Sequence, residues 1–213
     1  IQLQLLGQCI ADKKKTAHFA LETSTRQTML QIAGQRAEVN LRGLNVTPQD
    51  RLKRFNDALS YLGKGEDLRV YDRDLTMDAI AARCRALKQG WGLDCVSIDY
   101  LTIIGGGRGK TLYESVTDIA NRLVAFRKAV DCPVIVTCQL NRGSEREERE
   151  PRLSDLRDTG AIEQAGHRIV FIWRPVNDFS GAPQVGAEVG QRASYDCYLL
   201  QAKLRDGPVS SIK

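Results

Sequence analysis

Short apolar runs and stretches with helical spacing alternate along the chain. Runs typical of buried strands lie at residues 17–21, 68–71, 95–104, 133–138 and 168–173. Helical spacing is clearest at residues 112–130, where apolar residues recur every three or four positions and charged residues lie mostly elsewhere. Continuous apolar strands that alternate with helices predict an α/β fold with a mostly parallel sheet.

Capping and turn signals define elements near both ends of the chain. Ser24 followed by Gln27 is a capping-box pattern, which predicts that a helix begins directly after the first strand. Near the C-terminus, Asp206-Gly207 is a strong turn signal between two strand-like stretches, residues 195–203 and 209–212. These two stretches are therefore expected to form a β-hairpin.

Polar residues occur where three of the predicted strands end. Glu22 follows the first strand, Asp99 interrupts the third near its end, and Gln139 follows the fourth. Ligands of open α/β sheets bind beyond the carboxyl ends of the strands. There, one carboxylate suits a water-held Mg²⁺, a second can activate a water molecule, and an amide can sense a γ-phosphate. A purely structural role, in which these residues cap strands or helices, stays open at this point.

Composition adds limits rather than a function. The chain has 213 residues, 42% of them hydrophobic, and a net charge of +5, values typical of a globular domain. No apolar run approaches the roughly 18 residues of a membrane span, and the N-terminus lacks the basic segment of a secretory signal. A net charge of +5 does not by itself indicate nucleic-acid binding.

Cysteine usage favours reduced thiols in a cytosolic protein. Six cysteines are scattered without a C-x-x-C pair, so their spacing disfavours a zinc site or a disulfide framework. They are Cys9, Cys84, Cys95, Cys132, Cys138 and Cys197.

A glycine-rich segment, GGGRGKT at residues 105–111, imitates a phosphate-binding loop. The P-loop pattern G-x-x-x-x-G-K-[ST] would need its first glycine at position 104, which is Ile104. We therefore disfavour a P-loop here. A flexible basic loop, in which Arg108 and Lys110 reach phosphates, and a solvated linker both stay open.

Five segments together resemble one known family. In chain order they are DCVSIDYLTII, a long helix, CPVIVTCQLNR, PRLSDLRDTGAIEQAGHRIVFIWRP and AKLRDGP. This order and spacing resemble the C-terminal RecA-like motor domain of DnaB-type replicative helicases, over roughly residues 17–213. The resemblance implies one RecA-like domain over residues 1–213, with a mostly parallel sheet flanked by helices and a C-terminal β-hairpin.

The resemblance also implies roles for individual residues, with ATP and Mg²⁺ as cofactors. Asp99 matches the aspartate that holds Mg²⁺ through water, and Glu22 matches the glutamate that polarises the attacking water. Gln139 matches the amide that links the γ-phosphate state to the DNA loops. Lys203 and Arg205 match a basic pair that reaches the ATP site of the neighbouring subunit.

Two loops correspond to DNA-contacting loops of the family. Arg157, Asp158 and Gly160 match a loop that lines the central channel and holds the DNA backbone, and Arg108 and Lys110 lie in a second channel loop. Before the resemblance is counted, a salt bridge with a neighbouring acid is the alternative role for Arg157. Contacts to phosphates would make binding independent of base sequence and sensitive to salt.

The implied function is a ring-forming replicative helicase motor, a homo-hexamer in the complete protein. Such a motor couples ATP hydrolysis at subunit interfaces to 5′-to-3′ movement on single-stranded DNA and to duplex unwinding. A primase and a helicase loader are the expected partners, the cytoplasm is the expected location, and no membrane is involved.

The chain also departs from the family pattern. The P-loop should lie just before Ile1, and the N-terminal helicase domain is absent, so this segment alone is not expected to hydrolyse ATP. Two alternatives follow. Another RecA-like ATPase, of the RadA or KaiC type, would not share the run LRDTGAIEQ, and a non-catalytic nucleic-acid-binding or scaffold domain would need no P-loop.

Overall fold

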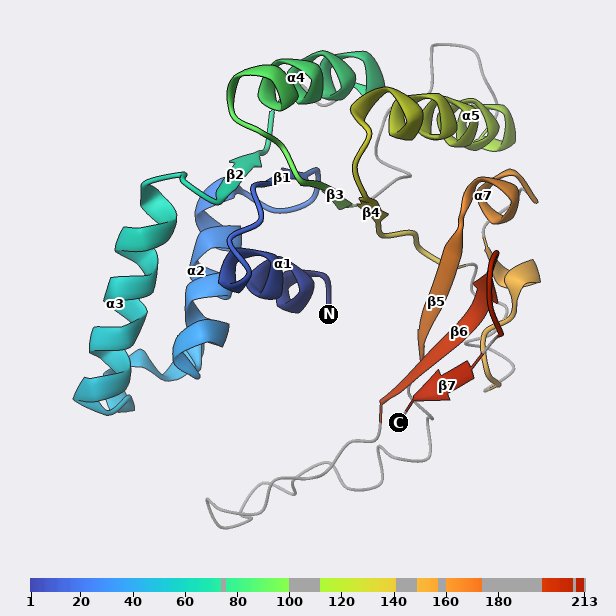
Figure 1. Ribbon diagram of the computed structural model, residues 1–213. Coiled ribbons are helices and arrows are strands. Elements are labelled where there is room, and N and C mark those ends of the chain that lie inside the picture. Colours follow the sequence, from blue (N-terminus) through green and yellow to red (C-terminus); the bar gives the residue numbers. More distant parts are fainter. Residues whose placement is uncertain are drawn as a thin grey trace.

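The computed structural model describes residues 1–73, 76–99, 112–140, 149–156, 160–173, 197–208 and 210–212. Within these residues the strands form two sheets, one with four strands and one with three (Figure 1). Helices cover both faces of the larger sheet, which confirms the predicted α/β class.

The larger sheet is parallel throughout and has the order β2-β1-β3-β4. Its strands are β1 (Thr16–Ala20), β2 (Leu68–Tyr71), β3 (Cys95–Asp99) and β4 (Val134–Val136). In the register, Ala20 lies beside Asp99, and Ile98 lies beside Val136. Because the strands are parallel, their carboxyl ends lie together at one end of the sheet, and their amino ends lie together at the other.

Two apolar cores cover the two faces of this sheet. On one face lie α1 (Gln2–Ala11), α2 (Thr25–Ala37) and α3 (Gln49–Gly63), and on the other lie α4 (Met77–Gly90) and α5 (Leu112–Val130) (Figure 1). Along β1, Ala17 and Phe19 join the core beneath α4 and α5. His18, between them, faces the opposite side, as strand alternation requires.

The element boundaries largely follow the sequence signals. Ser24 caps α2 by accepting a hydrogen bond from the backbone N–H of Gln27 at 3.2 Å, as predicted. Helix α4 ends at Gly90, and the left-handed residue that follows is Gly92, with φ of +82°. The strand predicted over residues 133–138 is shorter in the structure, where β4 covers Val134–Val136 and pairs with β3.

The smaller sheet is antiparallel and has the order β5-β6-β7. It consists of β5 (Arg168–Trp173), β6 (Tyr198–Leu204) and β7 (Ser210–Ile212), which confirms the C-terminal hairpin. The short helix α7 (Gly160–Ala165) leads into β5 and contacts α5. Its Ile162 packs against the core beneath α4 and α5. Two 3₁₀ helices, η1 (Leu41–Val46) and η3 (Leu153–Asp155), complete the described elements.

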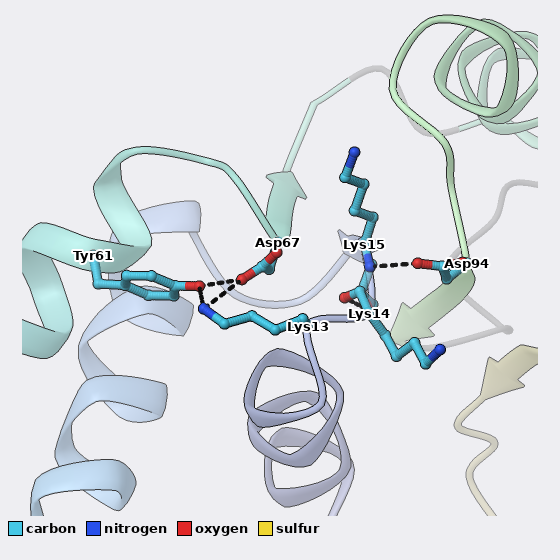
Figure 2. Close-up of polar contacts among 7 residues, drawn as sticks. Lys13, Lys14, Lys15, Tyr61, Asp67 and Asp94 are labelled. Carbon is cyan, nitrogen blue, oxygen red and sulfur yellow. Dashed lines mark hydrogen bonds and ion pairs between the residues drawn. The ribbon is translucent and has the colours of Figure 1, made fainter.

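At the amino end of the larger sheet, the run Lys13–Lys15 connects α1 to β1 (Figure 2). The ammonium of Lys13 donates to the hydroxyl of Tyr61 at 2.5 Å, and that hydroxyl donates to Asp67. The backbone N–H of Lys15 donates to Asp94 Oδ2 at 2.9 Å. This basic run therefore binds the turn to α3 and to the starts of β2 and β3.

Two further features concern the thiols and the helices. All six cysteines are free; burial raises the pKa values of the Cys84 and Cys95 thiols to about 12, while Cys197 is exposed. In the part of the chain that the structure describes, none of the helices combines the length and the apolarity that crossing a membrane requires.

Candidate active site

Three polar residues of the sequence analysis lie at the carboxyl end of the larger sheet. Asp99 is the last residue of β3 and is half-buried, and its carbonyl oxygen accepts a hydrogen bond from Leu21 N at 2.6 Å. Glu22, which directly follows Leu21, is exposed. Gln139 follows β4 by three residues and is also exposed. The fold therefore brings two carboxylates and an amide to neighbouring strand ends.

The Asp99 carboxylate is held from the adjacent strand. Thr137, the residue directly after β4, donates its hydroxyl hydrogen to Asp99 Oδ1 at 2.5 Å. The backbone N–H of Thr137 donates to the carbonyl of Ile98 at 3.1 Å, which continues the ladder by one residue. Sequence reasoning missed Thr137; its position two residues before Gln139 in a parallel neighbour of β3 is the signal that could have found it.

The loop that carries Glu22 is fixed on its far side. The Thr23 and Thr28 hydroxyl oxygens lie 3.1 Å apart in a hydrogen bond, and Asp72 Oδ2 accepts from the backbone N–H of Thr25 at 2.7 Å. That hydrogen bond is the main reason why the pKa of Asp72 is lower than usual. Asp72, which sequence reasoning also missed, thus connects the end of β2 to the start of α2.

A buried polar chain lies in the sheet below Asp99. Gln2 of α1 donates to the Ser97 hydroxyl oxygen at 2.8 Å, and Ser97 lies 3.1 Å from Nδ1 of His18. The side-chain amide of Gln2 only donates here, so the Ser97 hydroxyl hydrogen is available for His18. Burial lowers the pKa of His18 to about 4, although the negative charge of Asp99 acts to raise it. The ring is therefore neutral at pH 7.

The donor set at the carboxyl end suits a magnesium ion. Carboxylate oxygens are the ligands that Mg²⁺ prefers, and it often takes only one or two of them while water and phosphate oxygens supply the others. No group of three or more His, Cys, Asp or Glu side chains placed to hold a metal occurs within the described ranges. A single carboxylate, Asp99, therefore fits a water-held Mg²⁺ better than an all-protein cage.

The two basic residues of the hairpin lie on the smaller sheet. Lys203 donates to the carbonyl oxygen of Glu163, and Arg205 Nη2 donates to that of Gln164 at 3.1 Å. Both cations thus occupy the carboxyl end of α7, where carbonyl groups lack helical partners. Arg205 Nη1 also donates to Nε2 of His167 at 3.3 Å.

Positive charge gathers at this place. Arg127 of α5 is the largest cause of a lowered pKa at His167, with burial and the charge of Arg205 adding to it. Lys203 also lowers this pKa, and Asp206, whose effect is larger than that of Lys203, raises it. The hydrogen bonds of Lys203 and Arg205 go to α7 and His167 rather than to Glu22, Asp99 or Gln139.

The DNA-contacting candidates fall mostly outside the described residues. Arg108, Lys110, Arg157 and Asp158 belong to that part of the sequence. Gly160 is the first residue of α7 and is exposed.

Just before that loop, a buried carboxylate stabilises η3. Asp155 accepts from two nitrogens of Arg149, at 2.7 and 3.0 Å, and from the backbone N–H of Arg152 at 2.8 Å. These bonds, the one from Arg149 first, lower the pKa of Asp155.

Comparison with known proteins decides the family. The family model described as the DnaB-like helicase C-terminal domain matches residues 1–213, the whole chain. The chain belongs to this family. Among curated members, the replicative DNA helicase DnaB of Geobacillus stearothermophilus is 30% identical across 98% of this chain and 45% of its own length. The replicative DNA helicase DnaC of Bacillus subtilis is 29% identical across 97% of this chain and 45% of its own length.

Solved structures share the fold. A DnaB-like replicative helicase, described with its interactions with primase, superposes with a TM-score of 0.81 at 20% identity, covering 99% of this chain and 51% of its own. A second solved structure, described as an ATPase domain, gives the same TM-score and identity, covering 99% of this chain and 75% of its own. The predicted RecA-like architecture is thereby confirmed, and the chain spans about half the length of the curated relatives it matches.

Proposed function

We propose that this chain is part of the ATP-hydrolysing motor of a ring-forming replicative DNA helicase, which in the complete protein drives movement on single-stranded DNA and duplex unwinding. Family membership supports the reaction class. One observation supports the assignment to residues. Strand β3, which ends at Asp99, lies between β1, which leads to Glu22, and β4, which leads to Gln139.

In this proposal each group at the carboxyl end of the sheet has one task. Asp99 would hold Mg²⁺ through water, and the bound ion would supply positive charge to the phosphates of ATP. Glu22, exposed and fixed only through its loop, orients and polarises the attacking water. Gln139, in the segment after β4 that also contains Thr137, hydrogen-bonds the γ-phosphate and changes position when that group leaves.

Lys203 and Arg205 are proposed to act on the ATP site of a neighbouring subunit. A cation that reaches the phosphates stabilises the charge of the transition state. Within their own chain these two side chains are bound to α7, on the sheet that lacks the candidate carboxylates. This separation supports a site shared between copies, and hence a homo-hexamer in the complete protein.

We further propose that Arg157, Asp158 and Gly160, with Arg108 and Lys110 of the second loop, contact the backbone of single-stranded DNA. Such contacts need few aromatic side chains and bind without regard to base sequence. A primase and a helicase loader are the proposed partners, and the cytoplasm is the proposed location.

The complete protein is proposed to supply a P-loop just before Ile1. Within the described residues, β3 is the only partner strand of β4, which leaves the other edge of β4 open to a strand from that segment. The lysine and hydroxyl of a P-loop would cradle the phosphates beside Asp99.

The test is the activity of the complete protein on ATP and forked DNA, with Glu22→Gln as the decisive variant. Removing a general base typically lowers turnover by about 10²–10⁴-fold, so ATP turnover and unwinding should nearly vanish while nucleotide binding stays. Glu66→Gln, an exposed glutamate at the opposite end of the sheet, is the matched control and should be active.

Normal turnover by Glu22→Gln would refute the role of Glu22. DNA binding by the complete wild-type protein without any ATP turnover would instead favour the non-catalytic alternative.

A further inference from the structure

The contact between Thr137 and Asp99 joins two strand ends through side chains. Thr137 Oγ1 lies 2.5 Å from Asp99 Oδ1 and 3.5 Å from the carbonyl oxygen of Ile98. A hydroxyl has one hydrogen to donate, and the shorter distance assigns it to the carboxylate. Hydrogen bonds from a hydroxyl to an ionised carboxylate are short and stronger than neutral ones.

Both residues are half-buried, and the backbone fixes both from below. Thr137 N donates to Ile98 O at 3.1 Å, and Leu21 N donates to Asp99 O at 2.6 Å. The hydroxyl therefore acts on a carboxylate whose main chain is already held by a hydrogen bond, so what it adds is the orientation of the carboxylate group. With Oδ1 engaged, Oδ2 has no hydrogen-bond partner among the described residues and is the oxygen that can face a ligand.

We propose that Thr137 is a positioning residue for Asp99. The Thr137 hydroxyl fixes the Asp99 carboxylate in the orientation that receives the hydrated Mg²⁺ of the bound nucleotide. The inference rests on the proposed function, since it needs Asp99 to hold the metal. It adds a residue to that site and a direct link from β4, the strand that leads to Gln139, to the metal-binding carboxylate.

The experiment uses the complete protein and measures the dissociation constant of a fluorescent ADP analogue with excess Mg²⁺ and with EDTA. Thr137→Val replaces the hydroxyl by a methyl group of similar size, and Thr137→Ser keeps the hydroxyl. Losing an outer-shell partner typically costs 10–100-fold in metal affinity. We expect Thr137→Val to lose about tenfold of the affinity gained from Mg²⁺, with an unchanged constant in EDTA, and Thr137→Ser to resemble the wild type.

A structural role would not give this pattern, because it would weaken binding with and without Mg²⁺ alike. Full Mg²⁺-dependent gain in Thr137→Val, or an equal loss in Thr137→Ser, would overturn the inference. Thr137→Ala is measured in parallel, so that the hydroxyl is tested even where the valine variant does not fold.

Asp99→Asn separates this inference from the proposed function. If Asp99→Asn loses the Mg²⁺-dependent gain while Thr137→Val keeps it, Thr137 alone is wrongly assigned. If Asp99→Asn keeps the full gain, Asp99 does not hold the metal and the proposed function of this carboxylate fails.

Discussion

The two ends of the larger sheet both carry polar and charged side chains, but these are hydrogen-bonded to one another at the amino end and mostly exposed at the carboxyl end. At the amino end, Lys13, Tyr61 and Asp67 bond to one another, and Lys15 bonds to Asp94 (Figure 2). At the carboxyl end, Glu22 and Gln139 are exposed and have no hydrogen-bond partner in the described part of the chain, and Asp99 has one oxygen engaged.

This difference separates structure from chemistry. Polar groups that satisfy each other hold elements together, as the amino end does for α1, α3 and the strand starts. Polar groups kept apart at strand ends remain available to a ligand. To decide whether a carboxylate in a parallel sheet has a structural or a ligand-binding role, its existing hydrogen bonds matter as much as its place at a strand end.

The largest expected effect concerns the cation that a neighbouring copy is proposed to supply to the carboxyl end of the larger sheet. If Arg205 completes the site of a neighbouring copy, Arg205→Ala should lower ATP turnover by about 10³-fold or more, while Arg168→Ala, an exposed arginine of the same sheet, should be active. Mixing Arg205→Ala with Glu22→Gln should restore part of the turnover, because some interfaces then have both groups. Turnover that is never restored in mixtures would place Arg205 outside a shared site.

A smaller effect is expected from the buried His18, which lies in β1 between the two ends of the sheet. The neutral His18 has a pKa of about 4 in the fold against 6.5 as the reference. Below about pH 6.5 the unfolded chain binds the proton first, so stability is full above that pH and declines as the pH falls toward 4. The loss approaches roughly 3 kcal/mol. Thermal unfolding between pH 7.5 and about 4.5 should show this slope in the wild type and a weaker slope in His18→Ile.

An equal pH slope in the wild type and His18→Ile would exclude His18 as the titrating group. In that case the carboxylates with lowered pKa values, Asp72 and Asp155, would be the next groups to replace. Their contribution is present above their unfolded pKa and is lost only in more acidic solution, so the two pH ranges are distinguishable.

The smallest effect belongs to the amino end. Tyr61→Phe removes the hydroxyl between Lys13 and Asp67 and should lower the free energy of unfolding by about 1 kcal/mol, with ATP turnover unchanged. Tyr71→Phe is the matched control for stability, because its described contacts are the ring stack on Phe19 and the Arg83 cation. A large loss of turnover in Tyr61→Phe would abolish the distinction between the two ends.

The sequence pattern was sufficient for elements that local signals define. Apolar spacing located α5, and the polar interruption of an apolar run located Asp99 at the end of β3. The turn signal Asp206-Gly207 located the hairpin of β6 and β7.

Contacts that depend on register were not predictable in the same way. Thr137 and Asp99 are 38 positions apart, and the two meet only because β3 and β4 align Ile98 with Val136. Asp72 and Thr25, separated by 47 positions, meet in the same manner. The attachment of Lys203 to α7 likewise follows from how the second sheet packs, which no local pattern specifies.

The alignment of Ala20 with Asp99 makes the length of β1 a determinant of where Glu22 lies relative to Asp99. Deleting one residue from β1 would draw Glu22 back by about 3.3 Å and invert the facing of the strand, so that His18 would enter the apolar layer that Ala17 and Phe19 now fill. Strand length and register together therefore set where Glu22 lies at the carboxyl end of the sheet.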